Sequence, residues 1–486
     1  MKTGKIIALA LIISLLAGIF AGCFGGENPY DGQNPGDDYE VNIDMSDEDY
    51  NQVAELTIGI TADKYERDLV DALAADFKDI FPNVTITPVV ISGANYISAI
   101  GNRYETKTVP DIFFTSEKEA FSFISDEMFL NLKPYIKAEN LSANPDISKK
   151  GFESMFVEEA WKIGQESYGG DQYFVPRSSD RIVAHLNTKH LKDTFAYWNS
   201  NAPVDKRLPE DYRDIVKNGW TWEDFLKVCE AARSYYDSRN WYAAGDYYLI
   251  DHSFSWEPVM FSLLKSFGAT IAEGDTFVFD SPGTVAAAEA VRDLVTKGYI
   301  GPKGKGANYE IGRGLMLFHT SSAITKYNTY IKEDYDIVTF PVINGDDGVF
   351  GYGVPGYGIF SGIQTEKRDL AWQFLRYLLS EDGQESLAKA GMNTPSVRND
   401  LQDYNTASWG EGLRHLNLGA TTYQTYRNYT ENFFLNFEHG KKDAITSVMG
   451  QFMENITSYD KGKFLLTVQK SIDECKNNVQ RELNKI

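Results

Sequence analysis

The sequence predicts an α/β fold divided between more than one domain, and three observations carry this prediction. The chain has 486 residues, a length that corresponds to two or three domains at roughly 150 residues each. Short β-type runs alternate with helical patterns over its first part, which is typical of a parallel sheet covered by helices on both faces. Hydrophobic residues are 43% and charged residues 24% of the chain, so the bulk of it is expected to be soluble and folded.

The first part of the folded chain predicts a β–α–β start. Asp63 and Glu66 have the spacing of a capping box at the start of a helix, and Pro82 ends the helical pattern that follows. Strands are predicted at 56–60, 84–91 and 109–114, and helices at 63–80, after Asn95 and at 117–125.

Helices dominate the remainder of the chain. Two short strands, 173–177 and 182–186, flank a polar corner, and a β pattern interrupted by glycines returns between 336 and 360. Thr221 and Ser281 are expected to cap two of the helices, and Pro282 occupies the first helical position after Ser281. Further helices are predicted at 365–379, from Ser380, and at 465–483, where apolar side chains form a continuous stripe.

The N-terminus has the features of an export signal. Residues 1–22 contain two lysines followed by an apolar run that is too short for a comfortable transmembrane helix. The sequence Phe20-Ala21-Gly22-Cys23 resembles a bacterial lipobox, although Phe20 stands where leucine is usual. We therefore expect Cys23 to carry a lipid that anchors the protein at the outer face of the cytoplasmic membrane; the alternative is an unlipidated cysteine in a secretory signal.

Residues 23–55 are predicted to form a disordered acidic tether. This segment has ten acidic residues, no Lys or Arg, and few apolar residues, so it cannot offset the entropy of folding. The net charge of the whole chain is −22, and such an acidic chain is repelled by phosphate backbones, which argues against nucleic acid as a partner.

Motifs for enzyme or metal chemistry are missing. The sequence has no H-E-x-x-H, C-x-x-C or G-x-S-x-G motif and no Walker loop, and its six histidines lack ligand spacing. Cys229 and Cys475 lie on apolar helix faces and are expected to be core residues. No cofactor, metal or catalytic residue is therefore predicted. A pair of cleft carboxylates acting on a glycoside stays open, since with 69 acids some pair always lies near a cleft.

The order of several motifs resembles the family 1 extracellular solute-binding proteins of ABC transporters, which are sugar-binding lipoproteins with a maltose-binding-protein-like fold. The resemblance covers nearly all of 56–486. The segments that carry it are Val109-Pro110-Asp111-Ile112-Phe113, Leu130-Asn131-Leu132-Lys133-Pro134, Tyr173-Phe174-Val175-Pro176, Thr221-Trp222-Glu223-Asp224-Phe225, Phe279-Asp280-Ser281-Pro282, Tyr309–Leu317, Ala371-Trp372-Gln373-Phe374-Leu375 and Thr394-Pro395-Ser396-Val397-Arg398.

The resemblance implies two discontinuous α/β lobes joined by crossover strands, with a ligand held between them by hinge closure. Lobe one is expected to comprise 56–179 and 320–361, and lobe two 181–319 and 362–486. The implied function is capture of a carbohydrate, an oligosaccharide above all, by a monomeric protein that delivers it to ABC permease subunits. Two alternatives are a receptor that presents its ligand to a sensor kinase and an exported glycosidase.

Loops that follow strands supply the candidate ligand contacts on lobe one, because ligands of open α/β sheets collect at the carboxyl ends of strands. Thr61 and Asp63 follow the first strand and Asp111 opens the third. In the relatives that the sequence resembles, carboxylates in such places accept hydrogen bonds from sugar hydroxyls. The alternatives are that Asp63 is only a helix cap and that Asp111 only turns the chain.

The crossover and the glycine-rich segment supply the other candidates. Arg177, Asp180 and Arg181 are expected to clamp a ligand or to pair with one another. Trp256 resembles the aromatic residue that many sugar-binding relatives stack on a pyranose ring, with core packing as its alternative. Tyr352 and Tyr357 lie among glycines that allow close approach of a ligand, and the alternative there is a bulge with two exposed tyrosines.

Overall fold

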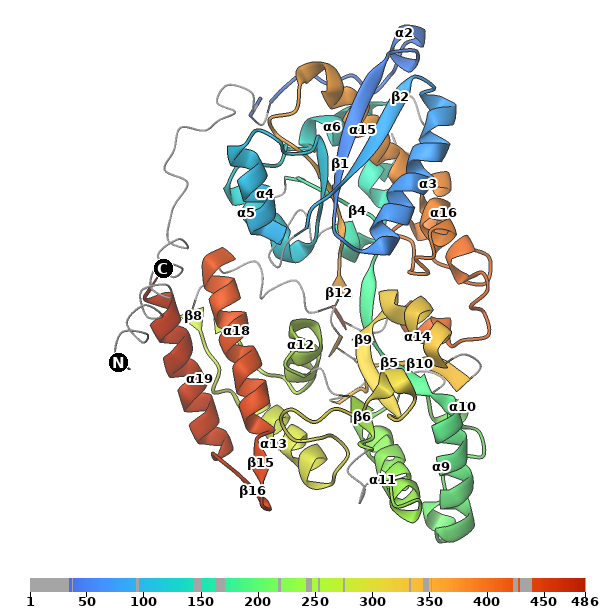
Figure 1. Cartoon of the computed structure of the whole chain (residues 1–486), viewed down its shortest axis with the longest axis vertical. Helices are drawn as coiled ribbons and strands as arrows, with labels where there is room; N and C mark the ends of the chain where they lie inside the picture. Colours follow the sequence, from blue (N-terminus) through green and yellow to red (C-terminus); the bar gives the residue numbers. More distant parts are fainter. Residues whose placement is uncertain are drawn as a thin grey trace, which may run out of the picture.

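The structure is a computed structural model of the whole chain, and it describes most of the residues after position 34. The described residues are 35–36, 38–92, 96–142, 150–161, 171–216, 220–241, 247–251, 254–273, 276–331, 334–343, 349–350, 352–422, 427–428 and 439–485. The expected export signal and Cys23 lie outside these residues. Two lobes are stacked along the long axis of the molecule, and each has its own sheet (Figure 1).

Lobe one is built on a five-stranded sheet with the order β2-β1-β3-β13-β4. Strands β1, β2 and β3 are parallel, whereas β13 runs antiparallel to both β3 and β4. The elements of lobe one are α2 (Asp47–Tyr50), β1 (Ala54–Ile60), α3 (Lys64–Ile80), β2 (Val84–Val90), α4 (Tyr96–Glu105), β3 (Ile112–Thr115), α5 (Glu117–Ser125), α6 (Lys133–Leu141), η1 (Phe152–Met155), β4 (Val175–Pro176), β13 (Gly356–Ile359), α15 (Thr365–Leu378) and α16 (Glu381–Lys389).

Lobe two is built on a second sheet with the order β10-β5-β9-β6, and β12 pairs with the start of β5. Its elements are β5 (Asp180–Asn187), α9 (Thr188–Asn201), η2 (Val204–Lys206), α10 (Tyr212–Val216), α11 (Trp222–Ser238), β6 (Ile250–Asp251), α12 (Glu257–Ser266), β7 (Ala272–Glu273), β8 (Thr276–Phe277), α13 (Pro282–Thr296), η3 (Tyr309–Ile311), β9 (Met316–Thr320), η4 (Ser321–Ala323), α14 (Ile324–Ile331), β10 (Tyr335–Thr339), β11 (Val349–Phe350), β12 (Tyr352–Gly353), η6 (Asn399–Leu401), η7 (Ser408–Gly410), η8 (Leu418–Thr421), β14 (Arg427–Asn428), α18 (His439–Ile456), β15 (Tyr459–Asp460), β16 (Lys463–Phe464) and α19 (Val468–Leu483).

The chain crosses between the lobes side by side at two places, which gives the hinge a paired backbone. One crossing joins β4 to β5 and the other joins β12 to β13. The amide of Arg177 in the first crossing donates to the carbonyl of Pro355 in the second, with 2.9 Å between N and O. The segment 391–401 contacts both lobes, because Gly391 accepts a hydrogen bond from the Thr325 hydroxyl and Asn399 donates to the carbonyl of Phe156.

The expected lobe boundaries are wrong for two parts of the chain. Residues 320–343 were expected in lobe one, but β10 pairs antiparallel with β5 in the sheet of lobe two. Helices α15 and α16 were expected in lobe two, but they cover lobe one (Figure 1). The ring of Phe374 on α15 meets Phe77 of α3 edge-on at 5.4 Å between centroids. Helical periodicity shows that one face is buried but does not identify the partner lobe.

The prediction of a disordered tether is wrong for its second half. Residues 38–53 lie against lobe one as an N-terminal arm. The Tyr39 hydroxyl donates to the carbonyl of Asn131 at 2.6 Å, Ile43 is buried, and Gln373 donates to the Ile43 carbonyl at 2.9 Å. Ser46 then caps α2. A few apolar side chains with matching backbone partners are therefore enough to order a strongly acidic segment.

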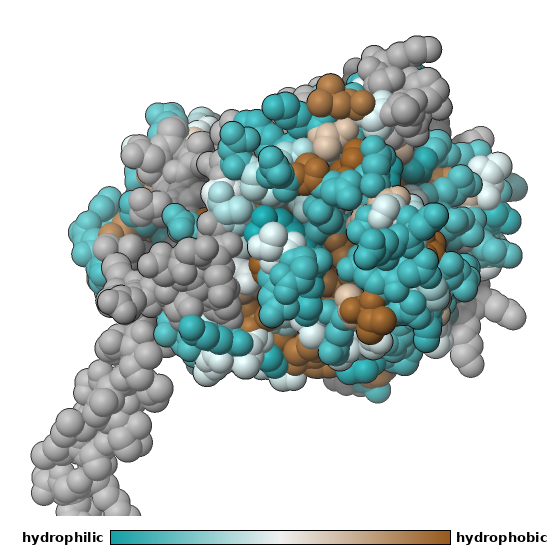
Figure 2. Space-filling model, turned by 90° about the horizontal axis from the view of Figure 1, so that it is seen from above, coloured by the Kyte–Doolittle hydropathy of each residue, from teal (hydrophilic) through white to brown (hydrophobic). Residues whose placement is uncertain are grey.

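Several local predictions are confirmed. Thr221 and Ser281 are N-caps whose side chains accept from the backbone N–H three residues later. Cys229 and Cys475 are buried and free, and burial raises the pKa of the Cys475 thiol to about 12. Among the described residues, no helix is long and apolar enough to span a membrane. The face seen in Figure 2 is mostly hydrophilic, with separate hydrophobic spots.

Candidate functional site

A cavity of about 370 Å³ lies where the two lobes meet at the hinge. Its wall comes from the start of α3 and from β3 in lobe one, from β9, η4 and α14 in lobe two, and from the crossing segments between them. The lining residues are Thr61, Asp63, Tyr65, Glu66, Phe114, Arg177, Asp180, His319, Ser322, Ala323, Lys326, Pro355, Gly391, Met392 and Thr394. Four of the sequence candidates, Thr61, Asp63, Arg177 and Asp180, are thus brought together in one cavity.

The loop after β1 supplies the wall of lobe one. The Asp63 carboxylate accepts from the amide of Tyr65 at 2.7 Å, so it caps α3 while it also lines the cavity. The two readings of Asp63 are therefore compatible. The expected second half of the capping box is wrong, because the Glu66 side chain turns to Arg177 instead of the backbone of Asp63.

Arg177 is the centre of a buried polar cluster under the cavity. Its guanidinium forms an ion pair with Glu66 and donates to the Ser178 hydroxyl at 2.7 Å. The Tyr357 hydroxyl donates to the other carboxylate oxygen of Glu66 at 2.5 Å. A buried charge needs such partners, because leaving it unpaired costs several kcal/mol, on the order of 3–5. These contacts fix the orientation of Glu66 and Arg177 at the hinge.

Asp180 is the first residue of β5 and faces the same cavity. Ser322 lines the cavity beside it and lowers the pKa of the Asp180 carboxyl group. Its Oδ1 is inaccessible to solvent and has no hydrogen-bond partner among the described residues. Burial raises the pKa of Asp180 to about 6, although the positive charge of Arg177 opposes the shift. The carboxylate thus has hydrogen-bonding capacity that the protein does not use.

The wall of lobe two carries His319 at the end of β9 and Lys326 on α14. Trp256 stacks on the His319 ring with 4.7 Å between centroids, and burial together with Lys326 lowers the pKa of His319 to about 4. His319 is therefore neutral at physiological pH. The Lys326 amine pairs with Glu310 at 2.6 Å. Trp256 is 37% exposed and is not among the residues given above as lining the cavity, which it approaches through the ring of His319.

Three other candidates do not line the cavity. The Asp111 carboxylate accepts from the amide and hydroxyl of Thr57 at 2.8 and 2.9 Å and thereby braces β3 against β1. Arg181 is buried, and its amide donates to the Ser321 hydroxyl at 3.1 Å. Tyr357 lies behind the wall, where it is 1% exposed and holds Glu66. The alternative of an exposed Tyr357 is also wrong.

For two further candidates, Tyr352 and Cys23, ligand contact and lipidation stay predictions. The backbone of Tyr352 pairs with Arg181 in the sheet of lobe two, but its side chain lies outside the described part of the chain. Cys23 lies outside the described residues altogether.

Sequence reasoning missed the lining residues that come from late in the chain. Lys326 follows a short 3-10 turn, and Gly391, Met392 and Thr394 follow α16 in a loop without a recognisable motif. Gly391 has a φ of +82°, which favours glycine and marks a sharp change in chain direction. Gly391, two residues after the end of α16, is the signal that the sequence of this loop offers.

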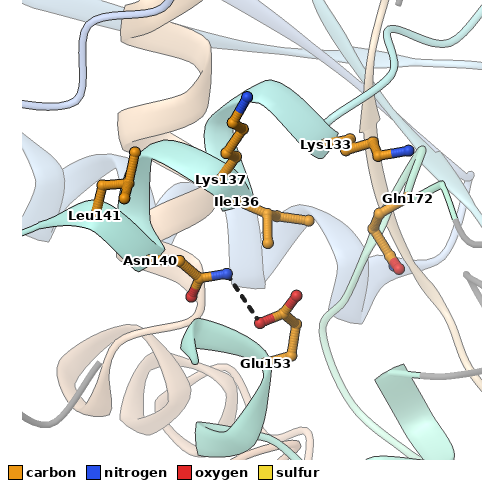
Figure 3. Close-up of a pocket in the computed structure, with 7 residues that line it drawn as sticks. All are labelled: Lys133, Ile136, Lys137, Asn140, Leu141, Glu153 and Gln172. Atoms are coloured by element: carbon orange, nitrogen blue, oxygen red, sulfur yellow. Dashed lines mark hydrogen bonds between the residues drawn. The ribbon is translucent and has the colours of Figure 1, made fainter. Parts of the chain in front are cut away.

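A second hollow, of about 330 Å³, lies on lobe one beside α6 and η1 (Figure 3). Asn140 donates to Glu153 across it at 3.4 Å, and the stems of Lys133 and Lys137 lie at its rim. None of its lining residues lines the cavity between the lobes, and none was a sequence candidate. The candidate residues that line a cavity therefore belong to the one between the lobes.

Comparison with known proteins shows the class of the chain. A family model described as bacterial extracellular solute-binding protein matches residues 72–411, which is more than half of the chain. The chain belongs to this family. No sequence among the curated proteins matches this solute-binding protein.

Solved structures of the same two-lobe fold resemble this solute-binding protein over most of its length. An ABC substrate-binding protein of Listeria monocytogenes in complex with cycloalternan is 15% identical, with a TM-score of 0.65 over 89% of this chain and 100% of that one. Maltose-bound MalE3 of T. maritima is 16% identical, with a TM-score of 0.62 over 88% and 100%. UgpB of Mycobacterium tuberculosis in complex with glycerophosphocholine is 14% identical, with a TM-score of 0.65 over 89% and 98%.

Proposed function

We propose that this solute-binding protein captures a carbohydrate, an oligosaccharide above all, between its lobes and delivers it to the permease of an ABC transporter. The observation that carries the proposal is a cavity bounded by both lobes and by the crossing segments. A ligand in such a cavity contacts both lobes at once, so its binding stabilises the closed arrangement over an open one. The permease can then distinguish the ligand-bound protein by its closed arrangement.

The lining of the cavity supports a carbohydrate as the ligand. Sugars need hydroxyl partners together with flat apolar surface. The hydrogen-bonding partners in the cavity are the carboxylates of Asp63 and Asp180 and the hydroxyl of Ser322. The flat surfaces are the rings of Phe114 and His319. Two of the structurally similar proteins named above hold cycloalternan and maltose.

The state of the carboxylates favours binding over catalysis. Hydrolysis of a glycoside needs a pair of carboxyl groups on opposite sides of the bond. Of the three that line the cavity, Glu66 is held by Arg177 and Tyr357, and Asp63 caps α3. Asp180 is left without a second carboxyl group free to act with it. We therefore propose that the protein returns its ligand unchanged.

A thermal melting screen followed by calorimetry tests the proposed function. At a ligand concentration 100 times the dissociation constant, binding is expected to stabilise the folded state by about 2.7 kcal/mol. Neutral mono- and oligosaccharides are the first panel, and each compound that raises the melting temperature is titrated to obtain its Kd. A response to a polyamine or a peptide with none to any carbohydrate would rule out the carbohydrate.

Trp256 is expected to affect binding without being essential for folding. In Trp256→Ala the ring that stacks on His319 is lost, so His319 is less well held against the ligand. Aromatic pairs contribute about 0.5–1.5 kcal/mol, which corresponds to a roughly two- to tenfold higher Kd. Calorimetry measures this change, and Lys137→Ala in the second hollow is the matched control that should leave Kd unchanged. If the two substitutions changed Kd equally, Trp256 would have no specific role in ligand binding.

Membrane attachment through Cys23 is part of the proposal. Cleavage before Cys23 and lipidation of its thiol would leave a short acidic linker between the lipid and the N-terminal arm that docks on lobe one. We expect Cys23→Ala to move the protein from the membrane fraction into the medium and to abolish incorporation of labelled palmitate. Retention of the variant in the membrane fraction would contradict the anchor.

A further inference from the structure

The charges that line the cavity restrict the class of ligand, if the proposed function above holds. We propose that the ligand is an uncharged carbohydrate, that one of its hydroxyl groups donates a hydrogen bond to the carboxylate of Asp180, and that acidic and basic sugars are rejected.

Asp180 is the group of the cavity whose hydrogen bonding the protein leaves incomplete. A carboxylate accepts several hydrogen bonds, and the Oδ1 atom of Asp180 has no partner among the described residues. A buried acceptor without a donor lacks the hydrogen bond that water would otherwise give it, and this is unfavourable. A ligand hydroxyl that donates to the Asp180 carboxylate supplies the missing hydrogen bond, whereas a ligand without a donor does not.

An acidic ligand meets uncompensated negative charge in this cavity. Asp63, Glu66 and Asp180 are the acids that line it, and Arg177 and Lys326 are the bases. Arg177 already pairs with Glu66, and Lys326 already pairs with Glu310 outside the lining. Both cations of the cavity that could pair with a carboxylate or phosphate on the ligand therefore already have a partner on the protein. At low dielectric, repulsion from Asp180 is only weakly screened.

A basic ligand is disfavoured by a different neighbour. The guanidinium of Arg177 is buried and close enough to Asp180 to oppose the shift of its pKa. An ammonium group placed at Asp180 would lose its water, and the desolvation of a buried cation is costly. A neutral hydroxyl does not have this problem, because it donates to the carboxylate without carrying charge.

Protonation of Asp180 gives the inference a signature that a purely structural role would not produce. The other titratable groups that line the cavity are Asp63, Tyr65, Glu66, Arg177, His319 and Lys326. His319 keeps its neutral form above about pH 4, because its pKa is lowered to that value, whereas the pKa of Asp180 is raised to about 6. As pH falls through about 6, the carboxylate loses an acceptor site and becomes neutral. Binding of a neutral sugar must then weaken, and repulsion of an acidic sugar must decrease.

The test is a calorimetric comparison of three sets of short oligosaccharides on the full-length protein. The neutral set contains malto-, cello-, xylo- and manno-oligosaccharides, the acidic set contains oligogalacturonates, and the basic set contains chitosan oligomers. We expect binding from the neutral set alone. For a neutral binder, we expect Kd to rise by about tenfold or more in Asp180→Asn, which is the loss of one hydrogen bond to a charged acceptor. We also expect Kd to rise between about pH 7.5 and about pH 5 in the wild type but not in the variant.

Ser322→Ala provides a second readout if Asp180→Asn does not fold. Ser322 lowers the pKa of Asp180, so removal of its hydroxyl should move the pH midpoint of binding to a higher value. Tighter binding of an oligogalacturonate or a chitosan oligomer than of every neutral sugar would overturn the inference and leave carbohydrate capture standing. A pH-independent Kd in the wild type would also overturn it. Failure of all three sets would instead overturn the proposed function itself.

Discussion

Replacement of Arg177 by methionine is expected to destabilise the folded protein by about 3–5 kcal/mol, because it leaves Glu66 as a buried charge without its partner. Glu66 is 3% exposed, and the Tyr357 hydroxyl also donates to its carboxylate. The ion pair also joins α3 of lobe one to the crossing between the lobes. We therefore expect weaker ligand binding together with the lower stability.

Urea unfolding of Arg177→Met measures the first effect. Lys189→Ala is the matched control, since its pair with Asp193 at 2.9 Å lies at the surface, where such pairs contribute about 0.2–1 kcal/mol. In Glu66→Gln/Arg177→Met the unpaired charge is gone, so part of the lost stability should return. A loss in Arg177→Met no larger than in Lys189→Ala would show that the pair does not support the hinge.

Trp372→Ala is expected to destabilise lobe one by about 3–5 kcal/mol, the usual cost of removing a large buried aromatic side chain. Trp372 on α15 is 0% exposed and stacks on Tyr135 of α6 at 4.9 Å between centroids. Its indole N–H donates to Glu139 at 3.1 Å. The substitution removes both the ring and one hydrogen bond to a buried carboxylate, so cavity and desolvation costs add.

Hydrogen exchange shows which part of the protein loses stability in Trp372→Ala. Because α15 covers lobe one, exchange should accelerate in α3 and α6 and stay nearly unchanged in α11 and α13 of lobe two. Leu465→Ala removes a side chain that is 72% exposed and should change stability by no more than about 0.5 kcal/mol. If exchange after Trp372→Ala were faster only in lobe two, α15 would belong to lobe two, as the sequence predicted.

Local structure could be predicted from the sequence where the signal lies within a few residues. The strand expected at 84–91 is found at Val84–Val90, and the helix expected at 117–125 is found at Glu117–Ser125. Caps at Thr221 and Ser281 follow from the hydrogen-bonding chemistry of their own side chains. The order of weak motifs led correctly to the family and to two lobes.

Partners that are distant in the chain could not be predicted. Glu66 has the spacing of a capping box, and only the fold reveals that Arg177, 111 residues later, competes for its carboxylate. Tyr357 was expected to contact the ligand, with an exposed bulge as the alternative, because glycines surround it, yet those glycines allow its strand to pack closely. Gly356 has no room for a Cβ against the Val175 carbonyl. Lys326 and the loop after α16 reach the cavity through tertiary packing alone.

A crystal structure of the protein saturated with a neutral oligosaccharide that binds in calorimetry tests the central claim most directly. The account predicts the sugar between the lobes, in contact with Thr61 of lobe one and Lys326 of lobe two, with a hydroxyl group at hydrogen-bond distance from the Asp180 carboxylate. The sugar in the hollow beside α6, or an empty cavity between the lobes at saturation, would contradict it.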